Sequence, residues 1–108
     1  MKLASGAAVA FFLACQGTTP IGKLLDDPGQ YEGKTVRVAG EVRTSIGALG
    51  QGAYEVEDST GRIPVVVRTG DGAPRVGARV GVEGEFRSAF TLGTRTLAVI
   101  MEKGRRSR

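Results

Sequence analysis

The chain has 108 residues and a formal net charge of +4 at pH 7, with 17 glycines, no histidine, no tryptophan and a single cysteine. Its length allows one small domain, and many glycines between short valine and isoleucine runs favour a small β-barrel or sandwich over a helix bundle. One cysteine without a histidine provides no internal disulfide, no thiolate metal site and no Cys–His or Ser–His pair. We therefore expect a protein that is not an enzyme, with no catalytic residues, no metal and no cofactor.

The positive charge is concentrated at the two ends of the chain. Lys2 and the four basic residues of the segment 103–108 account for five of the 15 Lys and Arg residues, so the other ten stand against 11 Asp and Glu residues. A nucleic-acid binder usually carries its positive charge across the binding face, so nucleic acid is not the expected partner. The segment 103–108 is predicted to be a basic, disordered tail. Its alternative role is to hold anionic head groups beside a membrane.

The first fourteen residues have the pattern of an export signal. Lys2 precedes an uncharged run from Leu3 to Ala14. As a helix this run would reach about 18 Å, short of the roughly 30 Å hydrocarbon core of a bilayer. A positive start before an apolar run of this length is typical of a secretory signal peptide.

The apolar run ends at Phe12-Leu13-Ala14-Cys15, which resembles the lipobox of bacterial lipoproteins, whose usual form is Leu-Ala/Ser-Gly/Ala-Cys. The resemblance implies that residues 1–14 are removed and that Cys15 receives acyl chains. Residues 15–18 would then tether the exported protein to a membrane of the cell envelope, facing the periplasm. Gln16 resembles outer-membrane sorting more than inner-membrane retention. Two alternatives remain: a plain secretory signal cut nearby, and a buried Cys15 thiol that ends an ordinary hydrophobic segment.

A short helix is predicted at the start of the domain. Thr19 as the N-cap and Pro20 at the first helical position favour a helix start. Ile21 and Leu24 then fall on one side of the helix. The segment 27–29, Asp-Pro-Gly, ends it, because the residue before a proline disfavours helix.

Five strands are predicted after this helix, because apolar and polar residues alternate with a period of two. In the fifth strand, Leu97, Val99 and Met101 are predicted to lie on one face. A long loop between the first two strands and the lack of crossover helices fit a small Greek-key barrel over residues 19–102. The predicted strands lie at residues 35–44, 53–58, 62–68, 79–87 and 94–101.

Three stretches, residues 27–40, 54–63 and 74–84, carry a recurring arrangement of turn glycines and core valines. This arrangement resembles small bacterial OB-fold proteins of the tRNA-anticodon-binding-like and periplasmic stress-induced types. The resemblance covers about residues 21–99. It implies an all-β fold, a five-stranded OB-like Greek-key barrel with a short N-terminal helix. It implies little about function, because one fold hosts many functions.

The outer face of the second and third strands is where OB-folds bind nucleic acid, stacking bases on aromatic side chains. In this sequence that face carries Glu55, Glu57, Arg62 and Arg68, while Tyr54 has the parity of a core residue. The charges are mixed and no stacking platform is present. Arg62 and Arg68 are the candidate contacts under the alternative hypothesis, a soluble single-stranded nucleic-acid binder.

Two loops carry apolar side chains that would form one exposed patch. Ile46 and Leu49 lie in the first long loop, and Phe90 and Leu92 lie between the fourth and fifth strands. These loops approach each other in an OB barrel, and exposed apolar clusters often mark partner or ligand sites. The alternative is that the four side chains plug one end of the barrel.

The leading hypothesis is a membrane-anchored, non-catalytic OB-fold binding module of the cell envelope. Cys15 is its lipid attachment site, and its partner is an envelope protein or a small ligand. A third hypothesis, an enzyme that uses Asp58 or Glu55 as an acid or base, rests on carboxylates that equally fit an ordinary turn and an ordinary surface.

Overall fold

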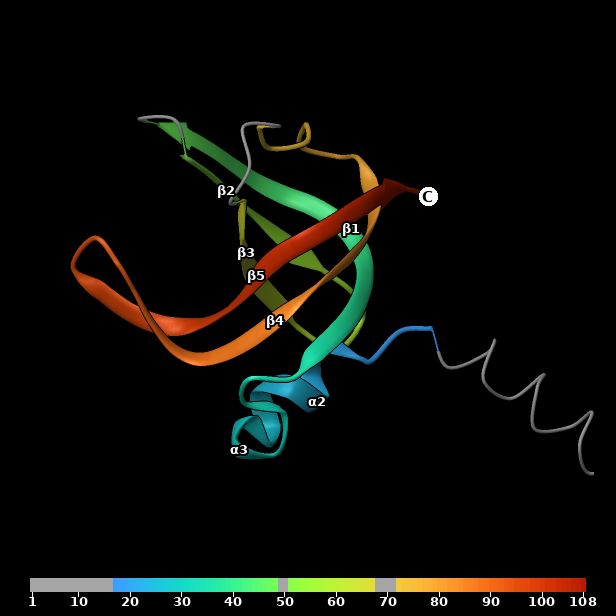
Figure 1. Ribbon diagram of the computed structural model, residues 1–108. Helices are drawn as coiled ribbons and strands as arrows, with labels where there is room; N and C mark the ends of the chain where they lie inside the picture. The colour runs from blue at the N-terminus through green and yellow to red at the C-terminus, as the bar shows by residue number, and fades with distance from the viewer. Residues whose placement is uncertain (1–16, 49–50, 68–71) are drawn as a thin grey trace, which may run out of the picture.

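The computed structural model describes residues 17–48, 51–67 and 72–108. Two short helices, α2 (Ile21–Asp26) and α3 (Pro28–Tyr31), precede a sheet of five strands. Figure 1 shows the strands curled into a barrel with both helices gathered at one end. The strands are β1 (Thr35–Ala48), β2 (Gln51–Glu57), β3 (Arg62–Val67), β4 (Arg79–Leu92) and β5 (Arg95–Ser107).

The five strands close into a barrel in the order β1-β2-β3-β5-β4, and β4 returns to β1. Neighbouring strands are antiparallel except β3 and β5, which run parallel. β1 has two partners in turn, because residues 35–41 pair with β4 and residues 41–48 pair with β2. The chain therefore has the five-stranded OB-like Greek-key barrel that its sequence predicted.

Two glycines allow β1 and β4 to approach their neighbours closely. A Cβ atom on Gly40 of β1 would overlap the carbonyl oxygen of Glu57, and one on Gly84 of β4 would overlap the carbonyl oxygen of Met101. The register between β4 and β5 also shifts between Glu83 and Gly84. Because only a residue without a side chain permits such an approach of two backbones, the barrel requires both glycines.

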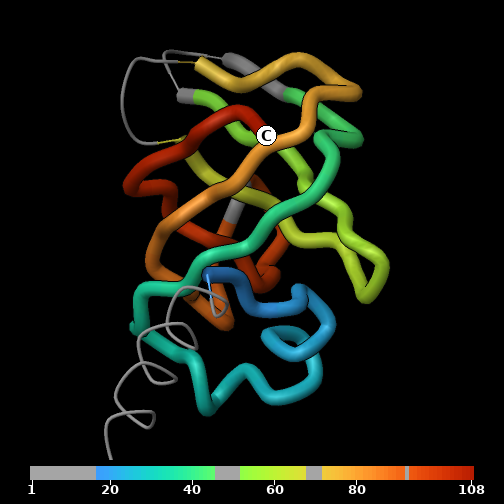
Figure 2. The backbone as a smooth tube through the Cα atoms, turned by 90° about the vertical axis from the view of Figure 1, so that its right-hand side faces the viewer, coloured from blue at the N-terminus to red at the C-terminus, as the bar shows by residue number. Residues whose placement is uncertain are grey.

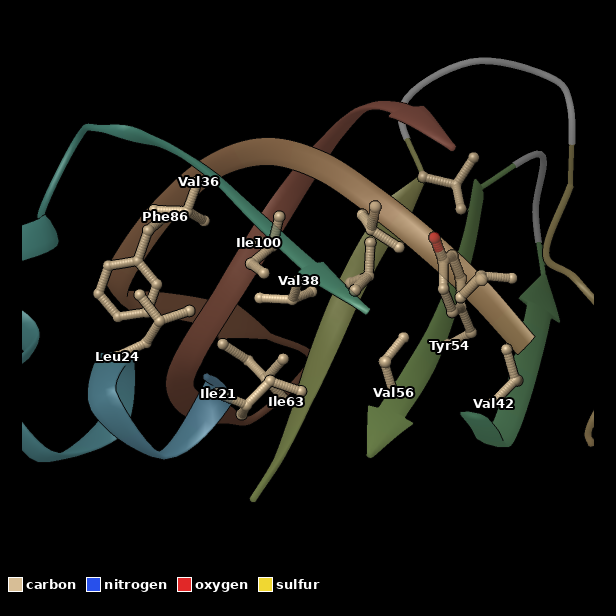
Figure 3. Packing of buried hydrophobic residues seen from close by; sticks show 14 residues of the cluster. Ile21, Leu24, Val36, Val38, Val42, Tyr54, Val56, Ile63, Phe86 and Ile100 are labelled. Atoms are coloured by element: carbon tan, nitrogen blue, oxygen red, sulfur yellow. The ribbon is translucent and has the colours of Figure 1, made fainter. Parts of the chain in front are cut away.

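The interior of the barrel is filled mainly by valine, isoleucine and aromatic side chains, and α2 covers one end. Ile21 and Leu24 of α2 are fully buried in the same cluster as the strand side chains (Figure 3). All cluster members lie between Ile21 and Ile100, and the strands end at Ser107, so residues 17–108 contain the complete barrel and its plug. The members are Ile21, Leu24, Val36, Val38, Val42, Tyr54, Val56, Ile63, Val65, Val67, Val80, Val82, Phe86 and Ile100.

The two sides of β5 belong to different clusters. Leu97, Val99 and Met101 share one face, as predicted, while Ala98 and Ile100 pack into the main core on the other side. Residues 97–101 are apolar at every position, so alternation could not select the inward set. The opposite side of β5 contributes to a second cluster, formed by Val66, Phe90, Leu97, Val99 and Met101.

The last residues of the chain are part of the sheet. β5 extends to Ser107 and pairs with β4, with Arg106 opposite Gly81 and Ser107 opposite Val80. Figure 2 shows the red end of β5 beside the orange β4. The prediction of a disordered tail over residues 103–108 was wrong, because backbone hydrogen bonds to β4 do not depend on side-chain charge. The basic residues therefore have definite positions on the barrel surface.

Candidate functional site

Of the four side chains in the predicted apolar patch, the structure describes that of Phe90. This side chain is half-buried and packs in the second cluster with Val66. Val66 alternates along β3 with residues of the main core, so the second cluster lies on the outer side of β3 and β5. Leu49 and the side chains of Ile46 and Leu92 lie outside the described residues. The predicted loop positions were wrong for three of the residues, since Ile46 lies in β1 and Phe90 and Leu92 lie in β4. A patch formed by all four side chains stays a prediction.

Ion pairs between and within strands cover the outer face of β1, β2 and β3. Arg62 lies 3.4 Å from Glu55 and 3.5 Å from Glu57, measured between guanidinium nitrogens and carboxylate oxygens. Arg43 lies 3.2 Å from Glu57 and 3.4 Å from Glu41. Such exposed pairs add at most about 1 kcal/mol each to stability, but they neutralise one another's charge. We call these five side chains the paired face.

The aromatic rings of the domain do not stand among the side chains of the paired face. Tyr54 and Phe86 are buried in the barrel, as their parity predicted, and Phe90 lies in the second cluster. Arg68, the second predicted nucleic-acid contact, lies outside the described residues. The five side chains of the paired face thus include no aromatic ring and carry no excess of positive charge, while the Phe90 ring packs in the second cluster with Val66 of β3.

Asp58 organises the turn between β2 and β3. Its Oδ1 atom accepts hydrogen bonds from the Thr60 amide at 2.7 Å, the Thr60 hydroxyl at 2.6 Å and the Gly61 amide at 3.0 Å. Its Oδ2 atom accepts a hydrogen bond from the Ile21 amide at 3.0 Å. Partial burial would raise the pKa of Asp58, but these hydrogen bonds outweigh the burial and hold the pKa below its ordinary value. The carboxylate is thus engaged on both oxygens within the fold.

The same turn caps helix α2 in place of the predicted N-cap. Pro20 occupies the N-cap position, and no side-chain hydrogen bond from that residue caps the helix. Asp58 accepts a hydrogen bond from the Ile21 amide, and the Thr60 hydroxyl accepts one from the Gly22 amide at 2.8 Å. The first amides of a helix lack partners within it, and here the turn supplies them from 37 residues further along the chain. The prediction of a cap at Thr19 was wrong, because the local sequence does not show that a turn far along the chain packs against the helix start.

A shallow groove of about 430 Å³ lies on the outer face of β1, β4 and β5. Pairing between these strands sets Arg37 opposite Glu83, and Glu83 opposite Gly104. In the next row of the sheet, Gly81 lies opposite Arg106. Because Gly81 and Gly104 carry no side chain, the sheet surface lies open between the longer side chains. Figure 2 shows β1 in green, β4 in orange and β5 in red running next to one another in this region.

The groove has an excess of positive charge. Arg37 forms an exposed pair with Glu83 at 3.8 Å. Arg106 and Arg108 are exposed and have no acidic partner within the described part of the chain. The signal that could have located them is their spacing of two residues from Gly104, which is typical of one face of a strand. The sequence had instead predicted a tail for this segment. The charged residues of this arginine-lined groove are Arg37, Arg105, Arg106, Arg108 and Glu83.

A polar network fixes the second half of β5 against the barrel. The Tyr54 hydroxyl donates a hydrogen bond of 2.8 Å to Oε1 of Glu102, and Arg105 donates one of 3.1 Å to the same oxygen. The Arg105 guanidinium also lies 5.4 Å from the centre of the Tyr54 ring and donates to the carbonyl oxygen of Gly72 at 3.3 Å. Burial, and then the hydrogen bond to Glu102, raise the pKa of Tyr54. This network holds the strand that carries Arg106 and Arg108.

The start of the described chain lies at the groove. Gly17 and Thr18 are among the lining residues, and the Thr19 amide donates a hydrogen bond of 2.7 Å to the carbonyl oxygen of Arg37. A second hollow, of about 370 Å³, also borders Gly17, Thr19 and Arg37. Residues 17–19 therefore lie beside β1 and the arginine-lined groove.

The described ranges contain no group of three or more Cys, Asp or Glu side chains placed to hold a metal ion. Nor does any helix within them have the length and apolar character needed to cross a membrane.

No protein-family model and no curated protein matches the chain, but solved structures do. Asparaginyl-tRNA synthetase from Pyrococcus horikoshii matches with a TM-score of 0.60 at 22% identity over 72% of this chain. A Leishmania major Friedlin protein, assigned as an aspartyl-tRNA synthetase, matches with a TM-score of 0.67 at 14% identity over 85% of this chain. The barrel is an OB-fold. The match covers only 20% and 21% of these synthetases, and identities this low show the fold alone.

Proposed function

We propose that this chain is a membrane-anchored, non-catalytic OB-fold binding module of the cell envelope, tethered through acyl chains on Cys15. The observation that carries the proposal is the position of Gly17 and Thr18 in the arginine-lined groove. Two residues of extended chain span about 7 Å, so an anchor at Cys15 would keep this face of the barrel close to the bilayer. The leader pattern of residues 1–14 supports the same location in the cell envelope.

A binding role is favoured over catalysis by what the polar residues do. The chain has no histidine, the commonest general base. Asp58 is bound on both oxygens by the turn and the helix start, and Glu55 is paired with Arg62. The proposed partner is an envelope protein or a small ligand, and the proposed location is the periplasmic side of a membrane, with the outer membrane favoured by Gln16.

Metabolic labelling with palmitate in a bacterial host tests the anchor. We expect the wild-type chain to be labelled and the Cys15→Ala variant to remain unlabelled, with Gln16→Ala as a labelled control for a change at the neighbouring position. Mass spectrometry of the mature protein should show Cys15 as the first residue, carrying the added acyl mass. Equal labelling of wild type and Cys15→Ala, or a mature chain that still begins at Met1, would refute the anchor.

The second candidate function is single-stranded nucleic-acid binding by a soluble OB domain. It is favoured by the shared fold with parts of two tRNA synthetases and by the arginine-lined groove. The neutralised charges of the paired face and its lack of a stacking ring disfavour that face as the site. Fluorescence anisotropy with a labelled single-stranded oligonucleotide at low salt tests this function, because phosphate contacts are strongest there. Binding that weakens in Arg62→Gln would favour it, and no binding at low salt would exclude it.

A further inference from the structure

We propose that the arginine-lined groove is a docking surface for the anionic head groups of the membrane that holds the anchor. The β1–β4–β5 face would then lie against the bilayer, with the helices and the paired face directed elsewhere. This inference rests on the proposed function for the presence of a membrane. It adds which face of the barrel contacts lipid and through which side chains.

The first support is the state of the charges. Arg106 and Arg108 are exposed, and no carboxylate within the described residues neutralises them. Guanidinium groups bind phosphate oxygens through two parallel hydrogen bonds, which suits lipid phosphates. Lys103 and Arg79 add positive charge nearby, since the Lys103 ammonium reaches the Thr35 hydroxyl on β1 and the Arg108 amide bonds to the Arg79 carbonyl oxygen.

The second support is the shape of the surface. A Cβ atom on Gly104 would have no heavy atom within 4 Å, and one on Gly81 would meet the Arg108 side chain at 3.2 Å. The floor of the groove is thus open at Gly104, while the Arg108 side chain lies across Gly81. An open and shallow surface of this kind suits contact with the plane of a bilayer better than it suits the enclosure of a small ligand.

The third support distinguishes lipid from nucleic acid. Single-stranded nucleic acids are bound by basic grooves that also provide aromatic rings for the bases. No aromatic side chain lines this groove in the described residues, and the nearby Tyr54 ring is only 2% exposed beneath Arg105. The groove thus offers guanidinium groups to phosphate oxygens but no ring to a base, while Tyr31 borders the second hollow. The same face is the one to which Gly17 and Thr18 lead from Cys15.

A chain of residues 16–108 tests the docking surface, because it keeps the whole barrel and its plug but lacks Cys15 and the leader. Its binding is measured by sedimentation with vesicles of phosphatidylcholine alone and of phosphatidylcholine mixed with phosphatidylglycerol. We expect binding only to the mixed vesicles, and weaker binding as salt shortens the reach of the charges. The double variant Arg106→Gln/Arg108→Gln should bind roughly 30-fold more weakly, the factor that corresponds to about 2 kcal/mol for two charges near an anionic surface.

The matched control is Arg43→Gln/Arg62→Gln, which makes the same change in net charge on the paired face. It should bind nearly as well as the wild-type domain, and circular dichroism should give all three proteins similar melting temperatures. Equal weakening of both double variants would overturn the docking surface, since net charge alone would then explain binding. Binding to a single-stranded oligonucleotide through Arg106 and Arg108, with none to the mixed vesicles, would also overturn it. Because this chain lacks Cys15, a failure of acylation and a failure of docking are separate results.

Discussion

The two charged faces of the barrel use arginine in different ways. On the paired face, Arg62 lies near two carboxylates of β2, and Arg43 lies near Glu41 of its own strand and Glu57 of β2. In the arginine-lined groove, Arg106 and Arg108 have no such partner among the described residues. The two faces share β1, so their difference comes from which residues the neighbouring strands place beside the arginines.

This difference shows that the arrangement of charges matters more than their number. Guanidinium groups between carboxylates offer little field to an outside anion, whereas exposed and unpaired ones attract it. The face that OB-folds use for nucleic acid is the neutralised one here. The excess of positive charge lies instead in the groove that the start of the described chain and the end of β5 both line.

The largest effect is expected from a change that separates β4 from β5, because the pairing of these strands builds the groove. Gly84→Ala would drive a Cβ atom into the Met101 carbonyl and close to the Ile100 side chain. We expect the free energy of unfolding to fall by about 3 kcal/mol, measured by urea denaturation followed by circular dichroism. Gly104→Ala on the neighbouring strand meets open space and should change stability by less than about 0.5 kcal/mol. Equal effects of the two changes would contradict the close approach at Gly84.

A smaller effect is expected at the turn that ends β2. Asp58→Ala removes the cap of α2 and the hydrogen bonds of the turn, and should cost about 2 kcal/mol of unfolding free energy. Since folding lowers the pKa of Asp58 below its ordinary value of 3.8, the wild-type contribution is present above that pH and disappears as the pH falls through the lower folded value. The difference between wild type and variant should therefore shrink in acid. Asp26→Ala on the exposed end of α2 is the control, and a difference that stays constant in acid would exclude a role of the ionised Asp58.

The smallest effect is expected on the paired face itself. Arg62→Gln removes two exposed ion pairs and should change the free energy of unfolding by less than about 0.5 kcal/mol. Arg106→Gln, which removes no ion pair, should change it as little, so stability alone will not separate the two faces. Urea denaturation of both variants checks this. A loss of more than about 1 kcal/mol in Arg62→Gln would show that the ion pairs help to hold β2 and β3 together.

The sequence by itself determined the barrel and much of its core. Strict alternation in the first four strands set which valines face inward, and the short apolar side of residues 21–24 marked the helix that covers one end. These features follow from local periodicity, because side chains in a strand alternate between two faces and one face must leave water. The leader pattern at Cys15 is equally local, and it remains a sequence-based expectation.

Which residues contact one another across strands follows from the tertiary structure and not from the local sequence. The tertiary structure selected Ala98 and Ile100 for the core from a run that is apolar throughout, and it capped α2 from a distant turn. It also paired residues 104–107 with β4, which turned a basic tail into one side of a groove. In each case the deciding partner is far away in sequence, so the outcome depends on backbone pairing and burial that local periodicity does not contain.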